Sequence, residues 1–273
     1  MSQVQSPKSE TRETETSSAN AQGASADPGH WTLDVGQSRA DVGRGTLDFR
    51  LTVTDLRKSF PTPAGGKIEV LRGVSFSARA GEAISIMGAS GAGKSTLLHL
   101  ICGLEAADHG SIIAGEFAIN RATSSALAHF RNKQVGFVFQ FHHLLPDLTA
   151  AENVSLPLLI TRTRHGLAMQ RAARMLAEVG LDSRMSASVV GHLSGGEQQR
   201  VAVCRALITS PVLVLADEPS GNLDTAIGDE IAHSLISYAR HNAALVIIAT
   251  HNRALAAICD RTLVLRHGKL CDV

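Results

Sequence analysis

Apolar runs of strand length recur along the chain and predict a buried sheet. Residues 82–88 (EAISIMG), 212–217 (VLVLAD) and 244–250 (ALVIIAT) are largely apolar and end in glycine or polar residues. Runs of this kind are typical of parallel strands that are buried on both faces. Residues 135–139 (VGFVF) have the same character and predict a further strand.

Two segments near the start of the ordered sequence have a different pattern. Residues 47–56 (LDFRLTVTDL) alternate apolar and polar residues, which predicts a strand with one face in water. Residues 67–79 (KIEVLRGVSFSAR) predict two further short strands. Residues 61–66 (PTPAGG) separate the two segments and predict a loop.

Helical spacing of apolar residues fills the intervals between the buried strands. We predict helices at residues 94–104, 121–134, 165–181 and 226–241. In the third helix, the residues expected on the buried face are Leu167, Ala172, Met175, Leu176 and Val179. Strands that alternate with helices indicate a parallel sheet covered on both faces, which is an α/β fold.

The first 46 residues differ from the rest of the chain. Residues 1–46 are rich in Ser, Thr, Gln, Gly, Ala and acidic residues and contain no Ile or Phe. Such a segment cannot bury enough apolar surface to offset the entropy of ordering it, so we expect a disordered tail. Trp31 is its one large aromatic residue. Residues 47–273 form one predicted domain.

Composition narrows the functional classes. The chain of 273 residues is 44% hydrophobic and 19% charged, which allows a globular core. Its net charge of +1 gives no electrostatic reason to expect a nucleic-acid partner. The four cysteines lack the C-x-x-C spacing of zinc or redox motifs. Without a run of 18 apolar residues or a secretory h-region, we expect a cytosolic protein that reaches a membrane through a partner.

A glycine-rich loop between a predicted strand and a predicted helix indicates phosphate binding. Residues 88–96 (GASGAGKST) fit G-x-x-x-x-G-K-[ST]. The glycines let the backbone N–H groups point inward at phosphate oxygens, and the helix N-terminus adds its positive dipole end. Lys94 would neutralise the β- and γ-phosphates, and Ser95 would coordinate Mg²⁺. The candidate nucleotide-binding residues of the loop are Gly88, Ala89, Ser90, Gly91, Ala92, Gly93, Lys94, Ser95 and Thr96.

Two other interpretations of this loop are open to sequence reasoning. It could be an ordinary glycine-rich turn that happens to contain a lysine. It could also bind a dinucleotide, but that motif requires G-x-G-x-x-G, and here Lys94, Ser95 and Thr96 follow the last glycine.

Acidic residues at the end of a second strand complete the candidate site. Asp217 and Glu218 follow an apolar strand and would lie at the carboxyl edge of the sheet, where α/β proteins bind ligands. Asp217 would hold Mg²⁺ through water, and Glu218 would polarise the attacking water as a general base. His251 follows another apolar strand and would reach the γ-phosphate. The alternative is that the two acids belong to an ordinary turn and that the histidine is structural.

Residues 192–207 (HLSGGEQQRVAVCRAL) resemble the signature of the ABC-transporter ATPases, usually Leu-Ser-Gly-Gly-Gln, with Glu197 here in the fifth place. Other motifs occur in the order of that family. Phe60 matches the aromatic residue that stacks on adenine, and Gln140 matches the glutamine of the Q-loop. Residues 220–224 (SGNLD) match the D-loop, and His251 matches the switch histidine. The resemblance covers roughly residues 47–273.

The resemblance implies a fold, a cofactor set and an assembly. The fold is a P-loop NTPase (RecA-like) α/β core with an N-terminal antiparallel β subdomain and an inserted α-helical subdomain at about residues 141–206. ATP and Mg²⁺ are the implied cofactors. The implied catalytic residues are Lys94, Gln140, Glu218 and His251, and the implied metal site consists of Ser95, Gln140 and Asp217. Phe60 and the phosphate loop would bind ATP in one chain of a homodimer, and the second chain would supply Ser194, Gly195, Gly196, Glu197 and Asp224.

Residues 139–160 (FQFHHLLPDLTAAENVSLPLLI) most resemble the lipoprotein-releasing group of this family, the LolD type. This resemblance implies an ATPase that is peripheral at the cytoplasmic face of the inner membrane and drives lipoprotein release through integral-membrane permease subunits. His142 and His143 are expected to face that partner. Macrolide or peptide exporters of the MacB type and the cell-division ATPase FtsE share much of the pattern, and both stay open as alternatives.

Overall fold

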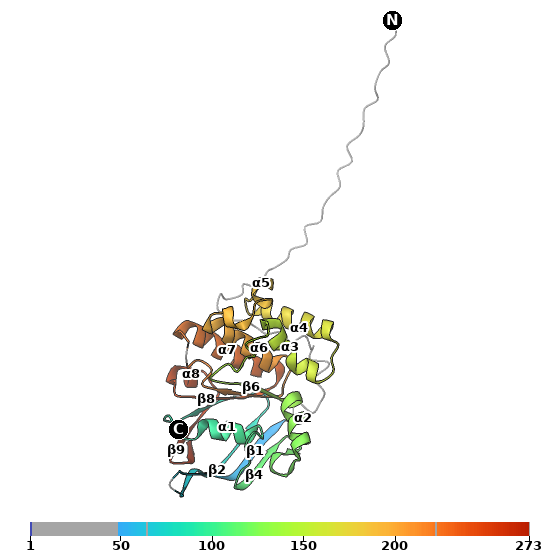
Figure 1. Cartoon of the computed structure of the whole chain (residues 1–273). Coiled ribbons are helices and arrows are strands. Elements are labelled where there is room, and N and C mark those ends of the chain that lie inside the picture. Colours follow the sequence, from blue (N-terminus) through green and yellow to red (C-terminus); the bar gives the residue numbers. More distant parts are fainter. Residues whose placement is uncertain (2–48, 64, 222, 273) are drawn as a thin grey trace.

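The computed structural model describes residue 1 and residues 49–63, 65–221 and 223–272. The predicted tail of residues 1–46, with Trp31, lies outside the described residues apart from Met1. Figure 1 shows the layers of the domain: helices α3–α7 cover one face of a large sheet, α1 lies on the opposite face, and a small antiparallel sheet follows beyond α1.

The large sheet, which has six strands in the described part of the chain, has the order β10-β9-β3-β8-β7-β6. Strands β9, β3, β8, β7 and β6 are parallel to their neighbours, and β10 pairs with β9 in the antiparallel sense. The bounds of these strands are β3 (Ala83–Met87), β6 (Val135–Val138), β7 (Leu213–Asp217), β8 (Leu245–Thr250), β9 (Arg261–Arg266) and β10 (Lys269–Asp272). The four buried strands predicted from the sequence are therefore confirmed as β3, β6, β7 and β8.

Side chains of the large sheet alternate between two hydrophobic cores. In β7, Val214 and Ala216 face the core under helices α3–α7, and Leu213 and Leu215 face the core that contains α1. Neighbouring β8 divides its side chains in the same way. Because both faces of these strands are covered, their sequences show no polar alternation.

The small sheet has four strands among the described residues, in the order β2-β1-β4-β5. Its strands are β1 (Arg50–Pro61), β2 (Lys67–Arg79), β4 (His109–Ala114) and β5 (Phe117–Ala118). The prediction of two short strands in residues 67–79 is wrong, because β2 is continuous over 13 residues. The pairing of β1 with β2 shifts register at a bulge in β1, where Asp55 has a φ of 44°. This bulge lets β2 continue through the position where its alternation of apolar and polar residues breaks.

The four predicted helices correspond to α1, α2, α4 and α7, and the described residues also form α3, α5, α6 and α8, for which no range was predicted. Their bounds are α1 (Lys94–Ile101), α2 (Ser124–Gln134), α3 (Ala150–Ile160), α4 (His165–Glu178), α5 (Ser183–Ser186), α6 (Gly195–Leu207), α7 (Thr225–Asn242) and α8 (Arg253–Ala257), with 3₁₀ helices at Ile119–Arg121 and Val190–His192. Helices α3–α5 lie within residues 141–206, the range that we propose as the helical subdomain, and α6 ends one residue beyond it at Leu207. None of the helices in the described residues has the length and apolar character that crossing a membrane requires.

One predicted core residue of α4 is wrong. Leu167 is 43% exposed, and Ala168 is fully buried. The buried stripe runs from Ala168 through Ala172, Met175 and Val179, so Leu167 lies about 100° away from its start. Leu167 lies at the edge of the buried stripe, and its apolar character led to its incorrect assignment to the buried face.

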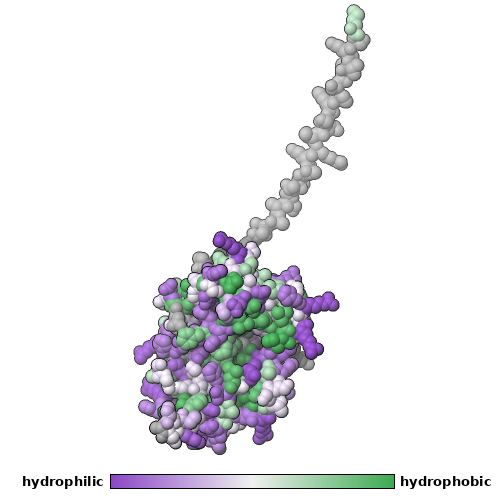
Figure 2. Space-filling view, viewed as in Figure 1, coloured by the Kyte–Doolittle hydropathy of each residue, from purple (hydrophilic) through white to green (hydrophobic). Residues whose placement is uncertain are grey.

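Apolar side chains also gather on the surface. Figure 2 shows such a patch over α3, on the side of the domain where the helices lie. Large apolar residues with high exposure include Ile160 at the end of α3 (70%) and Phe141 (67%) and Leu145 (48%) in the loop before it. We refer to Phe141, Leu145 and Ile160 as the α3 patch.

Candidate nucleotide site

Strand order brings the predicted site residues to one edge of the large sheet. The strands β3, β8, β7 and β6 are adjacent and parallel, so their carboxyl ends meet at that edge. The glycine-rich loop follows β3, His251 follows β8, Asp217 ends β7 with Glu218 next to it, and Gln140 lies two residues after β6. This edge is where open α/β sheets bind ligands.

The loop requires glycine at the positions that shape it. Gly91 and Gly93 have φ values of 75° and 99°, in the left-handed region that side chains avoid. A Cβ on Gly93 would lie 2.7 Å from Val70 Cγ1, and a Cβ on Gly88 would lie 2.7 Å from the carbonyl oxygen of Leu265. The loop is therefore packed tightly against β2 and β9 while its backbone turns into α1.

Lys94 lies inside the loop at the start of α1. Its side chain is 7% exposed, and Nζ donates to the carbonyl oxygens of Gly88 (3.1 Å) and Ala89 (3.3 Å). Nζ also lies 3.3 Å from Glu218 Oε1. The first turn of α1 carries no acidic residue, so its amides keep their positive potential. Together, the ammonium and the helix N-terminus form a site suited to phosphate.

Glu218 connects Lys94 with His251. Its side chain is 11% exposed, and Oε2 accepts hydrogen bonds from the backbone N (3.3 Å) and from Nδ1 (2.9 Å) of His251. The backbone of Glu218 has a φ of 46°, which is costly for a residue with a side chain. The Glu218 carboxylate contacts Lys94 of the loop, and the ring of His251, which is 71% exposed, lies on its other side.

Asp217 has the features of a metal ligand. Asp217 is 7% exposed as a whole residue. Its Oδ1 is buried and has no hydrogen-bond partner among the described residues. Burial raises the pKa of Asp217, while the hydroxyl of Ser95 and the charges of His99 and Lys94 act in the opposite direction. An unpaired carboxylate oxygen next to a hydroxyl fits Mg²⁺, which prefers oxygen ligands. The residues present are therefore suited to this ion.

Gln140, the third predicted metal ligand, is exposed in the loop after β6. A Cβ on Gly221 would lie 3.6 Å from Gln140 Nε2 and 3.4 Å from Glu218 Cβ. Gln140 therefore borders the segment that follows Glu218, at the exposed edge of the cluster.

Sequence reasoning missed His99. It lies four residues after Ser95 on α1, so both side chains project from one face of the helix. Its charge lowers the pKa of Asp217, and its ring centroid lies 5.7 Å from that of Phe137 on β6. The i, i+4 spacing from Ser95 was the available signal.

Phe60, the predicted adenine-stacking residue, lies near the end of β1. It is half-buried and pairs with Ile68 of β2, the strand that packs against the glycine-rich loop. Lys58 Nζ lies 5.0 Å from its ring centroid. A base that stacks on Phe60 must use the free ring face or displace Lys58.

The predicted signature residues form a helix cap. Ser194 is the N-cap of α6, its Oγ accepts from the backbone N of Glu197 (3.4 Å), and Glu197 Oε2 accepts from the backbone N (2.7 Å) and hydroxyl (2.9 Å) of Ser194. Gly196 is buried against Ile227 of α7. Asp224 is exposed at the start of α7, where its side chain caps no amide.

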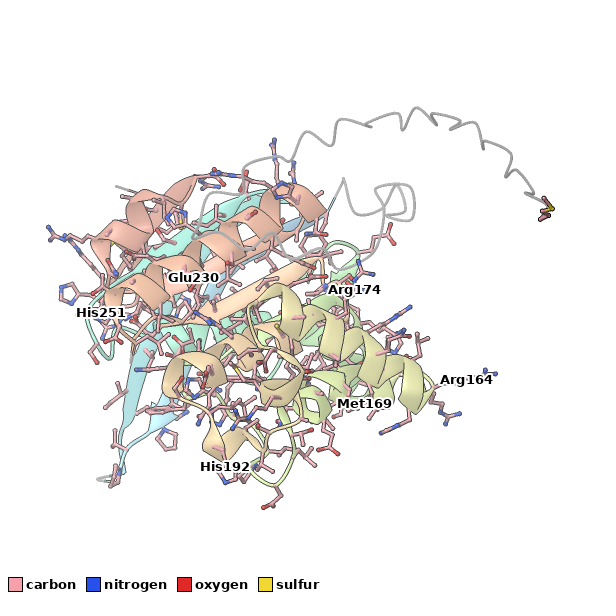
Figure 3. The ribbon with its side chains drawn as sticks, turned by 90° about the horizontal axis from the view of Figure 1, so that it is seen from above. Arg164, Met169, Arg174, His192, Glu230 and His251 are labelled. Atoms are coloured by element: carbon pink, nitrogen blue, oxygen red, sulfur yellow. The ribbon has the colours of Figure 1, made fainter. Side chains whose placement is uncertain are left out.

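The structure does not bring this cap onto the phosphate cluster of its own chain. The hydrogen bonds of Ser194 and Glu197 stay within the cap. Figure 3 shows His192, two residues before Ser194, well separated from His251. The glycine-rich loop and the cap are thus two separate helix N-termini, each suited to an anion.

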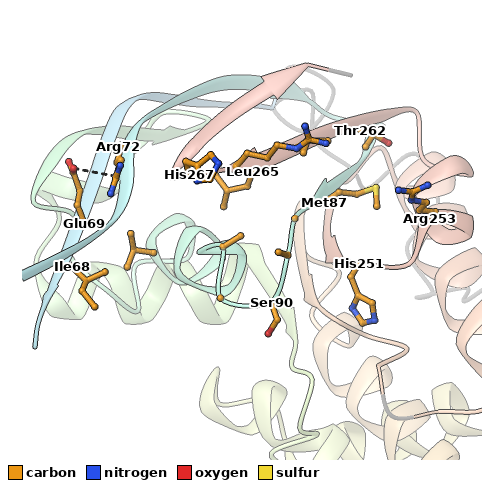
Figure 4. Close-up of a pocket in the computed structure, with 18 residues that line it drawn as sticks. Ile68, Glu69, Arg72, Met87, Ser90, His251, Arg253, Thr262, Leu265 and His267 are labelled. Atoms are coloured by element: carbon orange, nitrogen blue, oxygen red, sulfur yellow. Dashed lines mark ion pairs between the residues drawn. The ribbon is translucent and has the colours of Figure 1, made fainter.

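A cavity of about 880 Å³ runs along the glycine-rich loop. Its volume lies in the range of small-molecule sites. Figure 4 shows His251 at one end of it, Glu69 and Arg72, which pair at 3.5 Å, at the other, and Ser90 between them. Residues 88–92 line it together with parts of β2 and of the β9–β10 hairpin, and among its described lining residues none belongs to 194–197.

Comparison with known proteins identifies the family. A family profile described as ABC transporter matches residues 71–221. This chain belongs to the ABC transporter family. The lipoprotein-releasing system ATP-binding protein LolD of Geobacter metallireducens is 46% identical over 220 residues, covering 81% of this chain and 97% of that protein. The protein of the same name from Roseobacter denitrificans is 43% identical over 223 residues, covering 82% and 98%.

Solved structures agree with this assignment. A dimeric structure of a post-hydrolysis state of the ATP-binding cassette MJ0796 bound to ADP and Pi has a TM-score of 0.76 and 33% identity, and covers 81% of this chain and 96% of that one. A second dimeric structure of MJ0796, a bacterial ABC transporter cassette, gives the same values. The fold predicted from the motifs is confirmed. As a member of this family, the chain binds ATP and is an ATPase.

Proposed function

We propose that this ATPase works as a homodimer with two ATP molecules between its chains and drives the release of lipoproteins from the inner membrane. It would act at the cytoplasmic face, bound to integral-membrane permease subunits. The observation that carries the ATP-dependent part is the cluster of Lys94, Glu218 and His251 beside the glycine-rich loop, with contacts of 2.9 to 3.3 Å. The relatives whose names describe a lipoprotein-releasing system support lipoproteins as the cargo.

The ion pair between Lys94 and Glu218 suggests how the chain responds to ATP. Phosphate oxygens that enter the loop compete for the ammonium of Lys94, which releases Glu218 Oε1. The freed carboxylate then accepts a proton from the attacking water as a general base. His251, which now binds Glu218 Oε2, keeps the carboxylate oriented and would reach the γ-phosphate.

Metal binding in this proposal involves Ser95, Asp217 and Gln140. The hydroxyl of Ser95 and the unpaired Oδ1 of Asp217 would hold Mg²⁺, and Gln140 would complete its shell from the edge of the cluster. When bound, this ion neutralises charge on the phosphate oxygens. The chain itself keeps Asp217 fixed, because β7 is buried along its length.

The helix cap at Ser194 explains why a second chain is needed. A C₂ pairing would place the cap of one chain opposite the glycine-rich loop of the other and give two equivalent sites. Ser194 Oγ now donates to Glu197 Oε2, so its hydroxyl must turn before it can donate to a phosphate. Asp224 would lie in the same interface, since it is exposed at the start of α7.

The Glu218→Gln variant tests this arrangement. Glutamine cannot accept the water proton, so we expect ATP to stay bound and the mass in light-scattering chromatography to double when ATP and Mg²⁺ are added. The matched control is the double variant Lys94→Ala/Glu218→Gln, which should stay monomeric because its loop lacks the ammonium. A Glu218→Gln protein that is monomeric at saturating ATP, alone and with its co-purified permease, would contradict the composite site.

The cargo has a separate test. The tagged wild-type chain is purified with its permease from detergent-solubilised membranes and reconstituted in liposomes that contain a radiolabelled lipoprotein. We expect ATP to release the lipoprotein, and the complex with Glu218→Gln to release none. ATP hydrolysis without release of the lipoprotein would argue against this cargo while leaving the ATPase assignment intact.

A further inference from the structure

We infer that Arg205 is a positioning residue that fixes the helix carrying the Ser194 cap to the loop after Gln140, so that a partner docked on this loop can move the cap. This inference rests on the proposed function, because it assigns to one side chain the connection between the permease surface and the ATP-binding cap. The sequence motifs described above do not by themselves assign this connection to Arg205.

The contacts of Arg205 are specific. Its Nη1 donates to the carbonyl oxygen of His143 (2.6 Å) and its Nη2 donates to that of His142 (2.7 Å). One planar guanidinium thus holds two successive carbonyl groups in a fixed geometry. Because the donor is charged, these bonds are stronger than bonds between neutral groups. Arg205 lies in the last turn of α6, and Ser194 caps its first turn.

A second residue of α6 contacts the same loop. Gln198 lies seven residues before Arg205, on the same helix face. It hydrogen-bonds the ring of His142, and its Nε2 donates to the carbonyl oxygens of Val190 (3.1 Å) and Leu193 (2.9 Å) in the segment that leads to the cap. Burial, together with the charges of Arg205 and His143, lowers the pKa of His142. The His142 ring is therefore neutral at pH 7 and does not repel the guanidinium.

The loop is also fixed from the opposite side by α3. Asn153 is fully buried, and its Oδ1 accepts from the backbone N of Leu145 (2.8 Å). Its Nδ2 lies within 3.3 Å of the carbonyl oxygens of Leu145, Leu148 and Thr149. The segment from His142 to Thr149 is therefore a rigid connection between α3 and α6, and the exposed side chain of Leu145 projects from it.

Helix α6 can carry a displacement to the cap. It has 13 residues, which gives a length of about 20 Å. Because a helix of this length moves as a rigid body, a shift of the His142–His143 carbonyls would turn α6 through Arg205. The same shift would change the position of the Ser194 cap. Coupling of this kind needs a contact that both ends share, and the guanidinium supplies it.

The experiment compares Arg205→Lys with wild type, alone and with the co-purified permease in liposomes. Lysine keeps the charge but cannot hold both carbonyl groups in one plane. We expect kcat and KM for ATP of the isolated variant to stay within about twofold of wild type, and the stimulation of kcat by the permease to fall about tenfold. The control is Arg240→Lys, which alters an arginine in the last turn of α7 that pairs with Asp260 (3.2 Å). The permease should stimulate this variant as fully as wild type.

The outcomes separate this inference from the proposed function. Equal permease stimulation of wild type and Arg205→Lys would overturn the inference alone, and absence of stimulation in wild type would overturn both. A parallel loss of basal turnover and thermal stability would assign Arg205 a merely structural role and also overturn the inference. If Arg205→Lys does not fold, Gln198→Ala, which removes the second contact of α6 with the loop, takes its place with the same expected loss of stimulation. Full stimulation in Gln198→Ala would then overturn the inference.

Discussion

At the scale of single residues, the nucleotide site depends on a buried charge that has several partners. Lys94 is nearly inaccessible, and a buried ammonium is costly unless it is paired and hydrogen-bonded. Here the Glu218 carboxylate and two loop carbonyls share that role. Each of these partners can be replaced by a phosphate oxygen. The cluster thus stabilises the chain without nucleotide and is ready to exchange partners when ATP arrives.

Lys94→Ala should remove this response. Loss of charge-assisted hydrogen bonds of about 1.5–3 kcal/mol predicts that the Kd for ATP rises by at least about tenfold and that turnover falls to background. Binding of a fluorescent ATP analogue and phosphate release measure the two effects. Lys133→Ala, which alters an exposed lysine of α2, is the matched control and should change neither. Wild-type turnover in Lys94→Ala would refute the assignment of the phosphate loop.

The four cysteines should react in an order set by burial. Burial raises the pKa of Cys102 to about 11 and that of Cys259 to about 11, and it raises the pKa of Cys204 further. Because the thiolate is the reactive form, these thiols react slowly at pH 8, and exposed Cys271 should be alkylated first. Timed iodoacetamide labelling with mass spectrometry measures the order. In guanidinium all four should react at similar rates. Labelling of Cys204 as fast as Cys271 in the folded protein would contradict the buried position of Cys204.

Several site residues were accessible to sequence reasoning because each ends an apolar strand. Asp217, Glu218 and His251 follow runs that could be recognised by length alone, and parallel strand order then places them together. Arg205 could not be found in this way, since it contacts carbonyl groups 62 and 63 residues away. Contacts of this kind depend on how α6 packs, and no local pattern encodes that packing.

At the scale of elements, fully buried segments were predicted well and segments with one exposed face less so. The strands β7 and β8 have no exposed residue, so their boundaries follow the apolar runs. The interpretation of β2 as two strands failed because a bulge in its neighbour compensates for the break in pattern. The error at Leu167 arose because a long apolar side chain was assigned to the buried face of α4. The buried face is defined by the spacing of Ala168, Ala172, Met175 and Val179.

Helix α3 begins with a capping box that can be tested. Thr149 Oγ1 accepts from the backbone N of Glu152 (3.2 Å), and Glu152 Oε2 accepts from the backbone N and hydroxyl of Thr149 (both 2.8 Å). Replacing such a cap by alanine costs about 1 kcal/mol. We expect Thr149→Ala to lower the free energy of unfolding by about this amount in urea titrations, and Thr149→Ser, which keeps a hydroxyl, to restore most of it.

The same cap predicts a pH dependence. The amide and hydroxyl of Thr149 lower the pKa of Glu152. A lowered pKa means that the carboxylate stabilises the fold at pH values above the ordinary glutamate pKa of about 4.3 and that this contribution is lost as the pH falls through the folded value. The difference in stability between wild type and Thr149→Ala should therefore shrink below pH 4. A difference that is constant from pH 7 to pH 3 would show that the Thr149 hydroxyl does not stabilise the Glu152 carboxylate.

At the scale of the whole molecule, the α3 patch distinguishes one face of the domain. Phe141 and Leu145 expose apolar surface on the loop that Arg205 and Asn153 hold, and Ile160 does so at the end of α3. Exposed apolar patches of this kind mark interaction sites. The sequence predicted that His142 and His143 would face a partner. His142 is half-buried against α6, which leaves less of it for a partner, whereas His143 is exposed and stays a candidate for contact beside the neighbouring apolar side chains.

The double variant Leu145→Ser/Ile160→Ser tests this surface. An apolar side chain of this size contributes about 1.5–3 kcal/mol when it is fully buried, so the loss of two predicts permease binding that is weaker by at least about tenfold. Basal turnover of the isolated chain should stay within about twofold, because neither residue belongs to the nucleotide site. The matched control is Ile113→Ser on β4, which removes an isoleucine that is 42% exposed on another part of the surface and should bind the permease normally. Surface plasmon resonance on the purified permease in nanodiscs gives the Kd for each variant. Equal loss in the control would show that the effect is not specific to the α3 patch, and wild-type affinity in the double variant would exclude the patch as the permease-binding surface.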